Sequence, residues 1–113
     1  MSFKISDITT GTYKWPVHVY IPVDGGKHRK QTFTGIFKRH KTGEDPNPDD
    51  VTEDDGVEVF KRFFVGWSDI KDDDGNEVPF TDENLAEFLK APIFVVSVLN
   101  AWKTSIKAAK EGN

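Results

Sequence analysis

The chain has no cysteine, so neither disulfide bonds nor a thiolate metal cluster can hold its fold together. Its longest apolar run, residues 91–102, is interrupted by Ser97 and Asn100 and is too short to span a bilayer. The first residues lack the apolar stretch of a signal peptide. These absences predict a soluble protein with no membrane partner that is stabilised by packing alone, which suits a reducing cytoplasm.

The composition is otherwise that of a globular protein. Hydrophobic residues make up 36% of the 113 residues, and nine Phe and three Trp are too many for a wholly disordered chain. The length predicts a single domain, residues 1–113. Charge is segregated: residues 27–41 carry six Lys and Arg and no acid, whereas residues 44–58 carry eight acids and no base. The net charge of −4 argues against nucleic acid as a partner.

Residues 13–40 have the pattern of a long antiparallel hairpin. Apolar residues alternate along its first strand, with His18 and Tyr20 on the opposite face. The turn "VDGGK" at 23–27 favours the positive φ of a tight hairpin connection. Pro16 and Pro22 lack an N–H group, so we expect this strand at a sheet edge. Residues 1–12 show little periodicity and are predicted to be a loosely ordered lead-in.

The middle of the chain can be interpreted in two ways. Residues 41–51 are rich in Pro and acids, which predicts an acidic mobile connector. For residues 52–65 both helix and strand stay open. A helix is favoured, with Thr52 as its N-cap, while Gly56 and the valines after it suit a strand. The helical interpretation depends on an i, i+3, i+4, i+7 spacing of Phe60, Phe63, Phe64 and Trp67.

The acidic stretch around Gly75 has some likeness to a calcium loop. An EF-hand alignment places Ile70 at the first ligand position and Thr81 at the last, and neither supplies the carboxylate needed there. We therefore interpret this stretch as a solvated turn that leads into a helix capped by Thr81 or Asp82. The apolar stripe of that helix is predicted to contain Leu85, Phe88 and Leu89.

A last helix is predicted from Pro92 onward. Its N-terminal half is apolar nearly all round and must be covered by the hairpin or by another molecule. The predicted fold class is α+β, with the N-terminal hairpin followed by two to three α-helices packed on it. The stripe of the last helix contains Val95, Leu99, Trp102, Ile106 and Ala109.

No residue set makes a convincing active site. The histidines lack a metal-ligand spacing, and the carboxylates lie in solvated runs, so we predict no enzyme activity, no cofactor and no metal. Trp15, Tyr20 and Phe33 could stack nucleic-acid bases on the basic hairpin. We favour a different role for the basic residues, which is to protect an edge strand from aggregation.

Two stretches carry a resemblance. Residues 13–39 contain W-P-V-x-V-x-I-P-x-D-G-G-K followed by T-F-T-x-x-F-K, and residues 64–92 contain V-G-W, a glycine turn, P-F-T and N-L. Both resemble the small tail assembly chaperones of long-tailed bacteriophages and prophages, over about half of the chain. Relatives usually carry a longer helical segment between the blocks. The matching positions of the second block are Gly66, Trp67, Asp72 or Asp73, Gly75, Pro79, Phe80, Asn84 and Leu85.

The resemblance implies a non-enzymatic factor that coats the hydrophobic tape-measure protein, helps to recruit major tail tube protein, and is absent from the mature virion. It would act in the bacterial host cytoplasm, with a second copy of itself as a further candidate partner. The motif suggests that Trp67, Pro79 and Phe80 pack together, with Asp73 and Gly75 fixing the turn between them. A structural tail component and a small nucleic-acid-binding module remain alternatives. The candidate partner-binding residues are Ile93, Phe94, Val96 and Val98.

Overall fold

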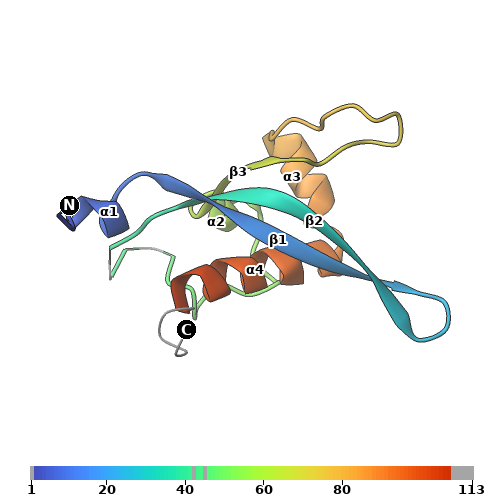
Figure 1. Ribbon diagram of the computed structural model, residues 1–113, viewed down its shortest axis with the longest axis horizontal. Coiled ribbons are helices and arrows are strands. Elements are labelled where there is room, and N and C mark those ends of the chain that lie inside the picture. Colours follow the sequence, from blue (N-terminus) through green and yellow to red (C-terminus); the bar gives the residue numbers. More distant parts are fainter. Residues whose placement is uncertain (1, 42, 45, 108–113) are drawn as a thin grey trace.

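The structure is a computed structural model that describes residues 2–41, 43–44 and 46–107. It has the predicted α+β class, with a sheet that begins in the N-terminal part and helices that follow (Figure 1). The elements are α1 (Ser6–Thr9), β1 (Thr12–Val23), β2 (Lys27–Lys38), α2 (Val57–Phe60), β3 (Phe64–Ser68), α3 (Asp82–Phe88) and α4 (Pro92–Lys107).

The predicted hairpin is confirmed as β1 and β2, which pair along their whole length. Gly25 and Gly26 in the connecting turn have φ angles of 89° and 74°, which a glycine adopts without steric cost. β3 pairs with the other edge of β2, so the order of this antiparallel sheet is β1-β2-β3. The hairpin extends well past the helices at its turn end (Figure 1).

The hydrogen-bonding directions along β2 follow from two bonds at its end. The Lys38 N–H donates to Phe63 on the β3 side, and the Arg39 N–H donates to Gly11 on the β1 side. Because these directions alternate along a strand, even-numbered residues of β2 bond away from β1. The register then places the N positions of Pro16 and Pro22 on the free edge of β1, as the sequence predicted.

The core lies between the sheet and α4, which packs against β1. Of the two coverings that the sequence left open, the hairpin therefore supplies the one seen here, although Ile93 and Val96 stay exposed. Of the predicted stripe, Val95, Leu99 and Trp102 are buried. Ile106 is wrong as a core residue, since it is 50% exposed close to the end of the helix, and Ala109 lies outside the described residues.

The favoured helix over residues 52–65 is wrong for most of its length. Only α2 is helical, it begins after Gly56, and Thr52 instead accepts a hydrogen bond from the Asp54 N–H inside a separate turn. The aromatic spacing misled because β3 contains a bulge: Gly66 pairs with Ile36 and Phe64 with Phe37, leaving Val65 extra. In a regular strand, side chains three residues apart point to opposite faces. The extra residue of the bulge puts Phe64 and Trp67 on the same face, so both are buried in the core although they belong to a strand.

The lead-in and the connector contain structure that the sequence did not predict. The lead-in forms the one-turn helix α1, from which Ile8 is more than half exposed. In the connector Val51 is buried, and the Asp49 carboxylate lies 3.1 Å from the Lys107 ammonium at the end of α4. The predicted mobility of both segments stays a prediction.

Candidate functional site

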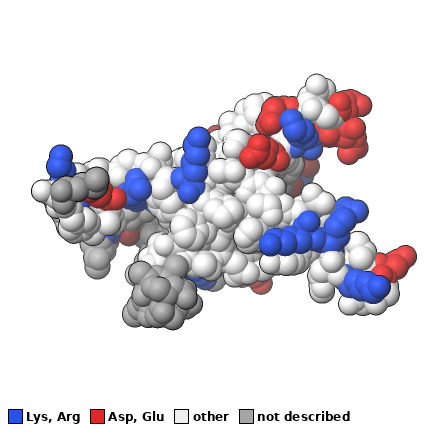
Figure 2. All heavy atoms as spheres, in the orientation of Figure 1, with Lys and Arg blue, Asp and Glu red and all other residues white. Residues whose placement is uncertain are grey.

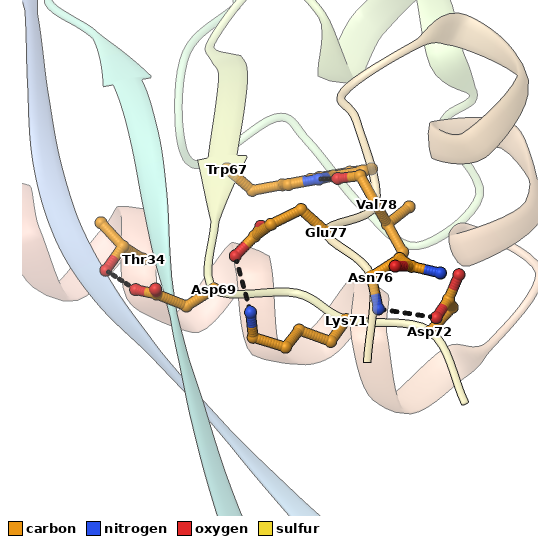
Figure 3. A network of polar contacts seen from close by, with 8 residues as sticks. All are labelled: Thr34, Trp67, Asp69, Lys71, Asp72, Asn76, Glu77 and Val78. Atoms are coloured by element: carbon orange, nitrogen blue, oxygen red, sulfur yellow. Dashed lines mark hydrogen bonds and ion pairs between the residues drawn. The ribbon is translucent and has the colours of Figure 1, made fainter. Parts of the chain in front are cut away.

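Trp67 is the centre of an aromatic cluster between β3 and the two last helices. Its side chain is 7% exposed, and its Nε1–H donates to the Val78 carbonyl at 2.7 Å (Figure 3). The Phe80 ring meets it edge-on at a centroid distance of 4.7 Å, and Phe88 lies 5.0 Å away. The cluster joins the strand, the loop that follows it and α3 in one packed unit.

The acidic turn is organised by Asp72. Its Oδ1 accepts a hydrogen bond from the Asn76 N–H at 2.9 Å (Figure 3) and another from the Asp74 N–H, also at 2.9 Å. Gly75 has a φ of 83°, and a Lys71–Glu77 ion pair of 3.2 Å closes the base of the turn. The assignment of this role to Asp73 is therefore corrected to Asp72, because an Asp bonds backbone groups two and four residues further along.

The remaining motif residues begin α3. Thr81 is its N-cap and accepts from the Asn84 N–H at 3.1 Å, while the Asn84 side chain donates to the Pro79 carbonyl at 2.9 Å. Pro79 itself is exposed, and Leu85 is fully buried. Gly66 lies against Ile36, whose Cδ1 would be 3.0 Å from an added Cβ. The spacing of the motif therefore serves a local structural unit.

A groove of about 420 Å³ separates this unit from the outer half of the hairpin. The Phe33 and Phe94 rings stack in it at 5.6 Å with their planes 2° apart. Acidic side chains gather over the loop that follows β3, and basic side chains lie on the hairpin beside it (Figure 2). The lining residues are Val19, Ile21, Gln31, Thr32, Phe33, Asp69, Ile70, Lys71, Glu87, Phe88, Ala91 and Phe94.

The four predicted partner-binding residues divide into two groups. Ile93 and Val96 are each 40% exposed and lie three residues apart on α4, so they can contact another molecule. Phe94 is half-buried and lines the groove, whereas Val98 is fully buried in the core. Sequence reasoning missed Phe88 and Ala91 as groove residues, because their exposure depends on the corner between α3 and α4.

A second cavity, of about 680 Å³, lies between the base of the hairpin and the end of α4. At its wall the Tyr13 hydroxyl hydrogen-bonds to Ser105 at 2.7 Å, and the Arg39 guanidinium lies 5.2 Å from the Tyr13 ring centre. Burial raises the pKa of the Tyr13 phenol above 10, although the hydrogen bond to Ser105 and the charge of Arg39 act to lower it. This is a structural polar contact at the hairpin base.

The histidines make ordinary structural contacts. His18 Nδ1 lies 3.0 Å from the Thr32 hydroxyl across the hairpin, and His40 Nε2 lies 3.1 Å from the Arg62 carbonyl, to which it donates. Within residues 2–41, 43–44 and 46–107, no group of three or more His, Asp or Glu side chains is arranged to hold a metal ion.

Comparison of the chain with protein-family models, with curated proteins and with solved structures gave no significant match. Over the part of the chain that the structure describes, no single helix is long and apolar enough to cross a membrane.

Proposed function

We propose that the protein is a non-enzymatic tail assembly chaperone of a long-tailed phage or prophage, which binds the tape-measure protein and aids assembly of the tail tube. The observation that carries the proposal is the exposed apolar pair Ile93 and Val96 on a helix that already buries its other apolar residues. An exposed apolar patch on an otherwise charged surface is typical of a protein-binding site. The resemblance of residues 13–39 and 64–92 supplies the class of partner.

The motif packing supports the same proposal. Trp67, Phe80 and Asn84 hold the loop after β3 against α3, which orients the corner from which α4 starts. Contacts that fix this corner before binding would reduce the ordering cost of presenting Ile93 and Val96 to a partner. The acidic residues of the neighbouring loop would keep a complex with an aggregation-prone partner in solution.

The experiment is co-expression with the tape-measure protein encoded in the same genome, followed by affinity pull-down and size-exclusion chromatography. We expect a soluble complex, with the tape-measure protein insoluble when expressed alone. Ile93→Asp and Val96→Asp should each reduce the amount of complex at least about tenfold, because each places a charge in an apolar contact. Ile106→Asp is the matched control, since it makes the same kind of substitution at a 50% exposed position near the other end of the same helix.

Two outcomes would contradict the proposal. Rings formed by this protein alone, without a complex, would favour a structural tail component. Equal complex formation by Ile93→Asp and by Ile106→Asp would exclude the exposed pair as the contact surface. The nucleic-acid alternative predicts an affinity for oligonucleotides that falls steeply with salt concentration, which gel-shift titrations at two salt concentrations would detect.

A further inference from the structure

The outer half of β2 has an open edge beside the groove. β3 pairs only with Thr34–Phe37, so within the described chain no strand pairs with residues 27–33 of β2 on that side. The alternation fixed by Lys38 and Arg39 directs the N–H and C=O groups of His28, Lys30 and Thr32 toward this open edge. All three residues are exposed.

The other edge of the sheet, formed by β1, lacks some of its hydrogen-bond donors. Along β1, Pro16 and Pro22 remove N–H donors from the free edge, which blocks continuous pairing with another strand. The open part of β2 contains no proline and keeps its donors. Of the two edges, the one beside the groove is therefore the one that can accept a further strand.

The groove can receive alternate side chains of such a strand. In β2, Gln31 and Phe33 belong to the face that meets the core and line the groove, where the Phe88 and Phe94 rings and Ala91 also lie. A strand added to this edge would point every second residue into this apolar space. The charged residues of the lining are Asp69, Glu87 and Lys71, and Lys71 is already paired with Glu77. Asp69 and Glu87 would therefore repel acidic residues at those positions.

The other side chains of an added strand would lie on the outer face of the sheet, next to His28, Lys30 and Thr32. On this face Lys30 is the cation of the open part of β2, because Lys27 and Arg29 alternate onto the face that carries Gln31 and Phe33. Acidic residues on the added strand would pair with Lys30. A second copy pairing β2 with β2 would instead bring the basic residues of both copies together. The charge pattern thus favours a different, acidic partner over self-association.

We propose that the open edge of β2 binds an extended peptide segment of a partner protein by strand addition, and that the segment alternates apolar with acidic residues. The apolar residues fill the groove, and the acidic residues lie beside Lys30. This inference goes beyond the proposed function, because it holds for any partner that carries such a segment.

The test uses a capped peptide of about eight residues that alternates Val with Glu, long enough to run along Lys27–Phe33. Binding to the full-length protein is measured by isothermal titration calorimetry, and backbone amide exchange by NMR. We expect binding that weakens with salt, with slowed exchange at Lys30 and Thr32. A peptide that alternates Val with Lys should bind at least about tenfold more weakly.

Two proline variants locate the edge. Lys30→Pro removes an outward N–H from β2, and Tyr20→Pro removes one from β1 at the partner position of the same rung. We expect Lys30→Pro to weaken peptide binding at least about tenfold and Tyr20→Pro to leave it within about twofold. Ala91→Trp, which fills the groove without touching the hairpin backbone, should weaken binding similarly if Lys30→Pro does not fold.

Several outcomes would overturn the proposal. These are no binding of the Val/Glu peptide at millimolar concentration, equal binding of the Val/Lys peptide, or exchange protection on β1 instead of at Lys30 and Thr32. Concentration-dependent dimerisation in sedimentation velocity that protects the same amides would assign the edge to a second copy and would also overturn it.

Discussion

The indole N–H of Trp67 donates a hydrogen bond of 2.7 Å to the carbonyl of Val78 and so ties β3 to the far end of the loop that follows it. The two residues are eleven positions apart in the sequence. The bond satisfies a polar atom inside the aromatic cluster and returns the chain toward the start of α3. Trp67 therefore contributes both apolar burial and a specific polar contact.

Trp67→Ala is expected to destabilise the protein by about 3–5 kcal/mol, because it removes a buried ring and leaves a cavity. Trp67→Phe keeps much of the apolar volume but leaves the Val78 carbonyl without its donor, which costs about 1–3 kcal/mol. Chemical denaturation followed by circular dichroism measures both. Unchanged stability of Trp67→Ala would contradict the central role of this residue.

The space above Gly35 is filled by the side chains of Phe37 and Val17. An added Cβ would come within 2.8 Å of the Phe37 ring and 3.0 Å of Val17. We expect Gly35→Ala to destabilise the protein by about 1–3 kcal/mol through overpacking. Gly56→Ser is the control, since a Cβ at Gly56 meets nothing within 4 Å and Ser is a good N-cap. Thermal unfolding of both variants compares them; equal stability would refute the close approach.

Asp72 and Asp73 provide a direct comparison of two adjacent acids. Asp72→Ala removes the acceptor of two backbone N–H groups and should destabilise the turn by about 1 kcal/mol. Asp73→Ala is expected to change stability by less than about 0.5 kcal/mol. Faster amide exchange at Asp74 and Asn76 in the first variant alone is the diagnostic measurement. The reverse order of effects would restore the role of Asp73.

The Tyr13 phenol links stability to alkaline pH. Since burial raises its pKa in the folded state above the unfolded value of about 10, folding favours the protonated form. This contribution is fully present below pH 10 and is lost as the pH rises through the folded-state pKa. Tyr13→Phe should therefore lose less stability than wild type over that interval.

At neutral pH the same variant is expected to cost about 0.5–1.5 kcal/mol, because the hydrogen bond to Ser105 is lost. Denaturant titrations of wild type and Tyr13→Phe from pH 8 upward measure both effects. Parallel stability curves for the two proteins would show that Tyr13 does not contribute to the alkaline loss. Tyr20, which is 49% exposed, serves as the control site through Tyr20→Phe.

Local sequence patterns were sufficient to predict an element where the pattern is compatible with a single local structure. The alternating strand, the Gly-Gly turn and the two prolines specified the hairpin and the free edge of β1, since a proline lacks the N–H that an interior strand needs. Capping and periodicity likewise placed the start of α3 at Thr81 or Asp82, of which Thr81 is the N-cap, and predicted the burial of Val95, Leu99 and Trp102 on α4.

Other features depended on partners that are distant in sequence. The aromatic spacing from Phe60 to Trp67 fits a helix, and only pairing with β2 and the bulge at Val65 made the segment a strand. Whether Ile93 is exposed while Val98 is buried depends on which side of α4 the hairpin covers. The groove and the open edge of β2 also depend on how segments distant in sequence pack together.

The sequence by itself determined the class of fold, the hairpin and the last helix, because each depends on interactions between near neighbours. The tertiary structure decided the strand at Phe64–Ser68, the division of the apolar helix into core and surface, and the length over which β2 lacks a neighbour. These features depend on how far one strand extends past another, and no local periodicity encodes that length.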